Sequence, residues 1–267
     1  MTKNSKRDTI IDEEIDLEDV TYQEIINEIN GIYNHLTLEI NKQIKQVEIL
    51  TDEERWTKEK ARREAQIISF RGAQIPRFEA NILQEIEKQL NKQFKKIDIS
   101  MFEKSEVQMG FSVENRRITG IGLFECFIGV LPESIGKLKS LQELDLGCNE
   151  LTTLPESISK LKSLQDLGLI GNKLKTLPES ITKLKSLQYL YLDMNQLKTL
   201  PESIVNLSSL KDLWLPYNQL TTLPESISKL TMLKRLNLSN NPLARKPNSR
   251  TKSILKQLKK NNIDIYD

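Results

Sequence analysis

Cysteine, histidine and aromatic residues are scarce in this chain. Its 267 residues include 2 cysteines, 1 histidine and 6% aromatic residues. Two cysteines cannot form the disulfide framework of a small secreted domain, and neither has a metal-ligand spacing with His35. We therefore expect a reducing compartment and no metal.

Long apolar runs and a dominant sign of charge are also missing. No apolar stretch approaches the ~18 residues of a membrane-spanning helix, and the first residues, MTKNSKRDTIIDEEIDLEDV, lack the apolar segment of a secretion signal. The formal net charge of +2 favours no class of partner. Basic residues gather between Arg245 and Lys260, which we interpret as a solvated helix face, with nucleic-acid or anionic-membrane binding as the lesser alternative. We expect a cytoplasmic protein without a membrane span.

One pattern dominates what is present. The pentad LPESI begins at Leu131, Leu154, Leu177, Leu200 and Leu223, a constant period of 23 residues that is typical of a solenoid. Each unit reads L-x-x-L-x-L-x-x-N-x-L, and the alternating L-x-L suits a short strand with leucines on one face. Because one unit has no core of its own, its leucines must pack against the next unit. We predict an α/β solenoid of six repeats over residues 118–243, with a parallel sheet along one side.

A near-invariant asparagine follows the strand of each unit. A side-chain amide carries donors and an acceptor, so an inward asparagine can satisfy backbone groups that the turn exposes. We predict a structural ladder formed by Cys126, Asn149, Asn172, Asn195, Asn218 and Asn241. Cys126 stands in the asparagine position of the first unit, and we interpret it as structural rather than reactive. Cys148 lies one position before its asparagine and should point the other way, which argues against a disulfide.

The LPESI segment should end each strand and open the opposite side of the solenoid. Proline cannot donate to a strand ladder, and the serine with the following apolar residues favours a turn of helix or 3₁₀-helix. The recurring lysines of KLKSL should lie on this convex side, where we interpret them as solubilising residues rather than a binding site.

With these motifs the chain resembles leucine-rich repeat proteins, in particular the 23-residue class of intracellular Ras-suppressor and Scribble-like proteins. The resemblance covers Ile118 to about Leu243. It implies a curved solenoid whose parallel strands line a concave face that binds other proteins, usually without catalysis.

The positions that vary between units lie between and just after the strand leucines, so we expect them on the concave surface. Units four and five gather large side chains there: Tyr189, Tyr191, Met194, Trp214 and Tyr217. Carboxylates surround them: Glu143, Asp145, Asp166, Asp193 and Asp212. Aromatic side chains commonly anchor protein interfaces, and an acidic rim favours a basic partner. The alternative is that tyrosines simply suit strand pairing and bind nothing.

Both ends of the solenoid need caps that cover the terminal leucines. Alternating apolar residues before ENRR predict a capping hairpin strand within residues 100–117. Residues 244–267 read as a C-terminal cap, in which Asn248 or Ser249 can cap a helix carrying Ile254, Leu255 and Leu258.

The N-terminal region has a helical rather than a strand period. From Tyr22 to Val47, apolar residues step by four and three, as in a coiled coil. A capping box at Thr51 predicts a second helix ending near Gly72, and Pro76 predicts the start of a third. Residues 20–99 therefore read as a small helical bundle or an intermolecular coiled coil, and residues 1–19 as a disordered tail.

Catalytic motifs are missing from the whole chain. It contains no phosphate-binding loop, no G-x-S-x-G and no H-E-x-x-H, and open carboxylates on a shallow surface would not exclude water. We predict a non-catalytic protein–protein interaction module, without cofactor, that acts as a signalling adaptor or scaffold. The alternative is a structural homo-oligomer assembled through residues 20–99. We expect no nucleic-acid partner, and the partner's identity is beyond the sequence.

Overall fold

The computed structural model describes residues 27–43, 66–97 and 108–267. The chain falls into two units, Met1–Arg62 and Arg63–Asp267. In the first unit, the described residues 27–43 form a helix, and its apolar residues Ile29, Tyr33, Leu36 and Ile40 are all 55–70% exposed. The tail expected over residues 1–19 and the helix expected from Thr51 lie outside the described residues, apart from its end near Gly72.

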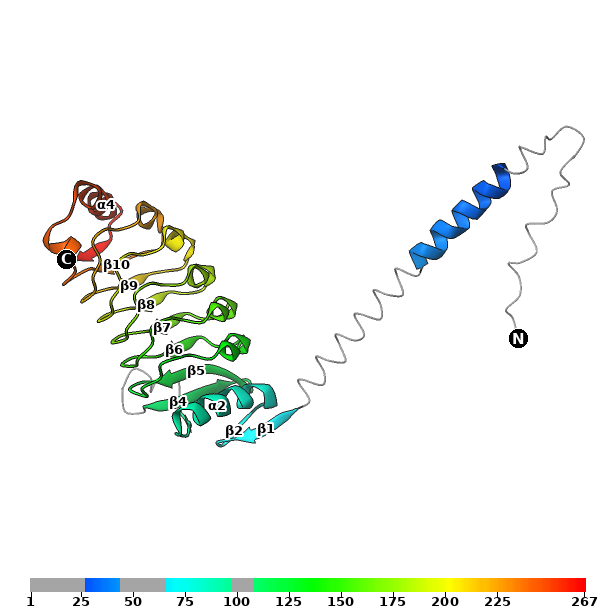
Figure 1. Ribbon diagram of the computed structural model, residues 1–267, viewed down its shortest axis with the longest axis horizontal. Helices are drawn as coiled ribbons and strands as arrows, with labels where there is room; N and C mark the ends of the chain where they lie inside the picture. Colours follow the sequence, from blue (N-terminus) through cyan, green and yellow to red (C-terminus); the bar gives the residue numbers. More distant parts are fainter. Residues whose placement is uncertain (1–26, 44–65, 98–107) are drawn as a thin grey trace, which may run out of the picture. The chain divides into compact units, whose positions relative to one another are not determined.

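The second unit is built on a nine-stranded sheet in the order β11-β10-β9-β8-β7-β6-β5-β4-β3. Its repeating strands are β5 (Arg117–Leu123), β6 (Glu143–Asp145), β7 (Asp166–Gly168), β8 (Tyr189–Tyr191), β9 (Asp212–Trp214) and β10 (Arg235–Asn237). Each pairs in parallel with the next, as Figure 1 shows, and the register advances by one 23-residue unit per strand. The solenoid predicted from the repeat is therefore confirmed.

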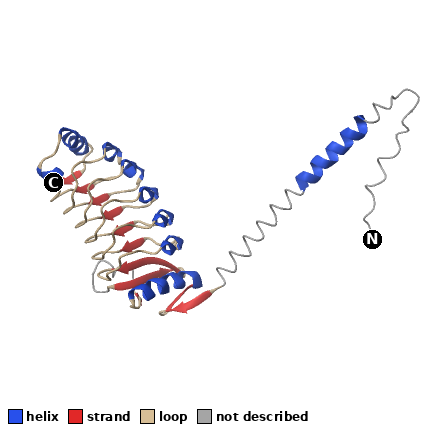
Figure 2. Ribbon diagram, in the orientation of Figure 1, coloured by secondary structure: helices blue, strands red, loops and turns tan. Residues whose placement is uncertain are grey.

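Five 3₁₀-helices run along the side opposite these strands (Figure 2). They are η2 (Glu133–Lys137), η3 (Glu156–Lys160), η4 (Glu179–Lys183), η5 (Glu202–Asn206) and η6 (Glu225–Lys229). Each is preceded by the proline of LPESI, whose φ near −66° suits the start of a helical turn. The leucines and isoleucines between the strands and these helices are almost fully buried, so the repeats share one continuous core.

Glutamates and lysines of the 3₁₀ side join each unit to the next. The carboxylate of Glu133 accepts hydrogen bonds from the backbone N–H groups of Glu156 and Ser157 at the start of η3, at 3.2 and 3.1 Å. At the other end of the helices, Lys139 Nζ donates to the carbonyl of Lys160, and Lys162 and Lys185 donate to the carbonyls one unit further on. These lysines do more than solubilise, because they bind the last carbonyls of the following helix.

The N-terminal cap differs from the helical region expected over residues 20–99. Residues 66–76 form the hairpin of β1 (Ile67–Phe70) and β2 (Ala73–Pro76), so the expected end of a helix near Gly72 is wrong. Arg71 and Gly72 both have positive φ, +48° and +80°, and form the turn. Glycine at positive φ ends helices and also makes hairpin turns, which explains the error. The helix expected from Pro76 is present as α2 (Arg77–Leu90).

Helix α2 covers the first repeat and shares its core. After it, β3 (Lys95–Lys96) pairs with β4 (Met109–Glu114), which forms an antiparallel hairpin with β5. Inside this cap Glu79 is fully buried, and its Oε2 accepts a 2.9 Å hydrogen bond from the Ile118 N–H. Its Oε1 lies 2.9 Å from Arg117 Nε, close enough for an ion pair but not aligned as a hydrogen bond. The hairpin, α2 and the first repeat thus belong to one folded unit.

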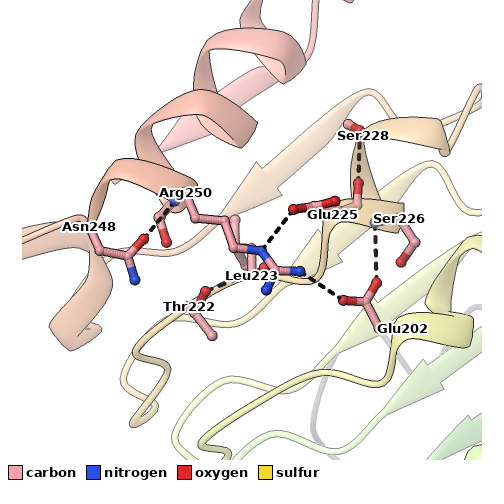
Figure 3. Close-up of polar contacts among 9 residues, drawn as sticks. Glu202, Thr222, Leu223, Glu225, Ser226, Ser228, Asn248 and Arg250 are labelled. Atoms are coloured by element: carbon pink, nitrogen blue, oxygen red, sulfur yellow. Dashed lines mark hydrogen bonds and ion pairs between the residues drawn. The ribbon is translucent and has the colours of Figure 1, made fainter.

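The C-terminal cap contains α3 (Pro242–Arg245), α4 (Ser249–Lys260) and β11 (Asp264–Tyr266). Asn248 caps α4 by accepting from the Thr251 N–H at 2.8 Å. Figure 3 shows Arg250 of α4 reaching two consecutive glutamates of the 3₁₀ side, Glu225 at 3.1 Å and Glu202 at 3.3 Å. The last strand, β11, then pairs in parallel with β10 and extends the sheet by one strand that the repeat pattern did not predict.

Candidate functional site

Buried asparagines position the strands from inside the solenoid. Asn195 is typical: its Oδ1 accepts from the Leu174 N–H at 3.0 Å, and its Nδ2 donates to carbonyls of its own and the preceding unit, among them Leu169 O at 2.8 Å. Asn172, Asn218 and Asn241 make the same set of bonds. Asn149 accepts from two N–H groups, those of Cys126 and Ile128. The ladder therefore fixes the ends of the strands that carry the variable side chains.

Cys126 completes this ladder in the first unit. It is buried, and its thiol lies 3.3 Å from the carbonyl of Gln108 and 3.4 Å from that of Phe124. Burial is the main reason that the pKa of this thiol is raised, which makes it a poor nucleophile. Both Cys126 and Cys148 are free.

The outward side chains of β5 to β11 form a surface that we call the sheet face. Two rows cross it, because the strands are in register. One row runs through Glu143, Asp166, Tyr189, Asp212, Arg235 and Asp264. The second runs through Asp145, Gly168, Tyr191, Trp214, Asn237 and Tyr266. Seven of the ten predicted site residues lie in these rows.

Three predicted residues lie just past the strands instead. Met194 and Tyr217 have positive φ, +53° and +54°, in the turn before the ladder asparagine, and they are 58% and 56% exposed. Asp193 precedes Met194, its carboxyl is half-buried with Oδ2 enclosed, and burial raises its pKa. These residues border the sheet face rather than project from it.

Aromatic rings gather on the C-terminal half of the sheet face. Tyr191 and Trp214 are cross-strand neighbours on β8 and β9. Trp214 stacks on Tyr266 of β11, with ring centroids 5.9 Å apart and planes inclined by 21°. Sequence reasoning missed Tyr266, because β11 follows β10 after 29 residues rather than 23; the alternation in IDIYD was the available signal.

Asp212 does not supply the exposed acidic charge expected of it. Its side chain is only 2% exposed, and it forms a bidentate ion pair with Arg235 on the neighbouring strand, with Nε 3.0 Å from Oδ1. Arg235 was not among the predicted site residues. The cross-strand pair neutralises Asp212, so the acidic residues left in the two rows are Glu143, Asp145 and Asp166 in the N-terminal half of the sheet face and Asp264 on β11.

Glycines let the Asp145 carboxylate lie flat against the sheet. Its Oδ1 accepts from the Gly147 N–H at 2.9 Å, and a Cβ added at Gly168 would lie 2.9 Å from the same oxygen. Burial raises the pKa of Asp145, and the Gly147 hydrogen bond opposes this only in part. The Asp145 carboxylate therefore lies close to the backbone of the sheet.

The phenol of Tyr191 remains protonated at any physiological pH. Its pKa is raised to about 12, mainly by burial and then by the charges of Asp166 and Asp212. A protonated phenol can donate a hydrogen bond to a partner. Tyr189 lies on the same strand, and Lys211 Nζ, from just before β9, lies 6.0 Å from the centroid of its ring, so this part of the face already holds a cation over an aromatic ring.

The described residues show no arrangement for metal chemistry. Among them, no group of three or more histidine, cysteine, aspartate or glutamate residues could hold a metal ion.

No helix within the described ranges has the length and apolar character to cross a membrane.

Comparisons with known proteins point to one family. The family described as "Leucine-rich repeat region" matches residues 158–262, and the one described as "Leucine rich repeat" matches residues 122–174. Among solved structures, a leucine-rich repeat protein of Leptospira interrogans is 30% identical with a TM-score of 0.54, over 69% of this chain and 51% of that chain. The present chain thus spans about half the length of that neighbour.

A second solved structure is the leucine-rich repeat ectodomain of the plant membrane receptor kinase GASSHO1/SCHENGEN3 from Arabidopsis thaliana, in complex with CASPARIAN STRIP INTEGRITY FACTOR 2. It is 24% identical with a TM-score of 0.40, over 56% of this chain and 17% of that chain. No curated protein matches the chain. None of these matches supports the narrower resemblance to Ras-suppressor or Scribble-like proteins.

Proposed function

Because the chain is a leucine-rich repeat protein, we propose that it binds a basic protein partner on its sheet face and serves as a non-catalytic adaptor or scaffold. Leucine-rich repeat domains generally mediate protein–protein interaction, and their fold is typically non-enzymatic.

One observation carries the proposal: partly exposed aromatic rings lie in register beside carboxylates on the same sheet. Tyr191, Trp214 and Tyr266 offer broad apolar surfaces with polar edges, the residue types that dominate binding energy at interfaces. Glu143 and Asp166 are cross-strand neighbours on β6 and β7. A partner with basic residues beside an apolar side chain would match both halves.

The test compares capture of partners from native lysate by the full chain and by sheet-face variants. Trp214→Ala should lower the affinity for a captured partner by ~2 kcal/mol or more, the usual scale for an interface anchor. Tyr191→Phe removes only the phenol hydroxyl and should cost ~0.5–1.5 kcal/mol if that group donates to the partner. The matched control is Lys183→Ala, an exposed residue of the 3₁₀ side.

Charge variants separate electrostatic effects on the association rate with the partner from effects on the stability of the fold. Asp166→Asn should slow association and reduce its dependence on salt. Asp212→Asn should instead destabilise the fold, because Arg235 loses its bidentate partner. A partner retained by Trp214→Ala but lost with Lys183→Ala would place binding on the 3₁₀ side and refute the proposal.

A second candidate function is self-association through the helix at residues 27–43. Its exposed residues Ile29, Tyr33, Leu36 and Ile40 follow the four-three spacing of a coiled-coil seam. Sedimentation equilibrium of the full chain tests it: Leu36→Glu should convert an oligomer to a monomer, whereas Glu39→Gln should not. A wild-type monomer at high concentration would exclude this function.

A further inference from the structure

Helix α4 presents a row of lysines on the face that points away from the solenoid. Ile254, Leu255 and Leu258 are buried against the last repeat, whereas Lys252, Lys256, Lys259 and Lys260 are exposed. The other exposed residues of α4 are Ser249, Arg250, Ser253 and Gln257. The outward surface of α4 is therefore basic, with no apolar and no acidic side chain.

A stabilising effect on helix α4 does not explain why these four positions are lysines. Lys252 and Lys256, and Lys256 and Lys260, are i,i+4 pairs of like charge, and such pairs slightly destabilise a helix. Lys259 and Lys260 are favourable at the helix C-terminus, but Lys252 lies near the N-terminus, where a cation opposes the helix dipole. None of the four takes part in the ion pairs formed by the described residues.

Arg250 of the same helix, unlike the four lysines, forms ion pairs with the solenoid. Its guanidinium binds Glu225 and Glu202, and at the other end of α4 Asn261 donates to the Ser228 carbonyl at 3.0 Å. These contacts and the buried apolar residues fix the orientation of α4, as Figure 3 shows for its first turn. The four lysines are held outward on a fixed helix and are available to an external anion.

We propose that the lysine face of α4 docks this protein onto an anionic lipid bilayer as a peripheral contact. Lys252 to Lys260 span ~12 Å along the helix at 1.5 Å per residue, and clusters of four to eight basic residues on an amphipathic helix suit anionic membrane surfaces. Lysine binds phosphate as a point charge, whereas base recognition relies on arginine, amide and aromatic side chains. The outward face of α4 has no aromatic residue, and its only arginine is bound to glutamates, which favours a bilayer over nucleic acid.

The contact would be electrostatic and reversible by salt. Without an exposed apolar side chain on α4, the helix has nothing to insert into the acyl region. The proposal is independent of the sheet face, because binding of a protein partner there neither requires nor excludes it.

The experiment is sedimentation of the full chain with vesicles of phosphatidylcholine, alone or with a third of phosphatidylserine. We expect binding only to the anionic vesicles and its loss at high salt. Each lysine should contribute about fivefold to the partition coefficient, so the variant Lys252→Gln, Lys256→Gln, Lys259→Gln, Lys260→Gln should bind at least about a hundredfold more weakly. Its melting temperature should stay close to that of the wild type, because the loss of like-charge repulsion and the loss of favourable charges at the helix C-terminus oppose each other.

The control removes similar charges elsewhere: Lys160→Gln, Lys183→Gln and Lys229→Gln on the 3₁₀ side. This variant should bind anionic vesicles nearly as well as the wild type. Equal weakening by both variants would show a response to net charge alone and overturn the assignment to α4. So would wild-type protein that ignores phosphatidylserine, or that binds a DNA duplex at salt concentrations where vesicle binding is lost.

Discussion

Replacing Asn195 by alanine isolates the contribution of one rung of the asparagine ladder. The substitution removes an acceptor from the Leu174 N–H and donors from three carbonyls. The carbonyl of Leu169 keeps a second donor from Asn172, and that of Leu192 keeps one from Asn218. Among the described residues the Leu174 N–H has no other hydrogen-bond partner, and the site is buried.

The cost is therefore dominated by one buried N–H left unpaired, about 2–3 kcal/mol of unfolding free energy. The same reasoning gives a larger loss for Asn149→Ala, since Asn149 accepts from two N–H groups. Asn241→Ala should cost as much as Asn195→Ala despite its place near the end of the stack, because its side chain is 1% exposed and makes the same bonds.

Urea unfolding followed by far-UV circular dichroism measures these differences. The surface control is Asn206→Ala, which removes an exposed side chain of the 3₁₀ side and should change stability by less than ~0.5 kcal/mol. Losses for Asn149, Asn195 and Asn241 that match the Asn206 control would refute the reasoning. So would an Asn149 variant more stable than the Asn195 variant.

Three further substitutions test the N-terminal cap, the 3₁₀ side and the sheet face. Glu79→Ala should lower the unfolding free energy by ~1–3 kcal/mol, because the buried Ile118 N–H loses its acceptor; urea titration gives the value. Gly136→Ala should also destabilise the fold by ~1–3 kcal/mol, because the new Cβ would lie 2.5 Å from the Ser157 carbonyl oxygen. Burial raises the folded pKa of Asp145, so the wild type loses stability as pH rises from the unfolded pKa through the folded pKa. Asp145→Asn should thus be the more stable protein at neutral pH and lose that advantage in acid, as urea titrations across pH would show.

The repeats could be predicted because the same physical requirement recurs every 23 residues. Leucines that pack against the next repeat recur at the same position of every unit, and so do asparagines that hydrogen-bond the backbone of a turn. The caps show no periodic sequence pattern, since each occurs only once in the chain. Residues 66–76 were read as the end of a helix because Gly72 at positive φ suits a helix terminus and a hairpin turn equally.

The site could be predicted in part for a similar reason. The rows containing Tyr191 and Trp214 follow from the period, and the register confirms that these two residues are cross-strand neighbours. The ion pair of Asp212 with Arg235 depends on side-chain conformation, which the repeat spacing does not determine. Tyr266 belongs to a strand outside the period, so only the finished sheet reveals its stacking on Trp214.

The lysine contacts of the 3₁₀ side have a consequence for extending this protein by design. They join η2 to η3, η3 to η4 and η4 to η5, but Ser208 stands where the next lysine would reach η6. Arg250 spans that joint instead, because it binds Glu202 of η5 and Glu225 of η6 together. Units duplicated ahead of η5 would keep every joint intact, whereas a unit inserted between η5 and η6 would separate the two glutamates and leave α4 anchored to only one of them.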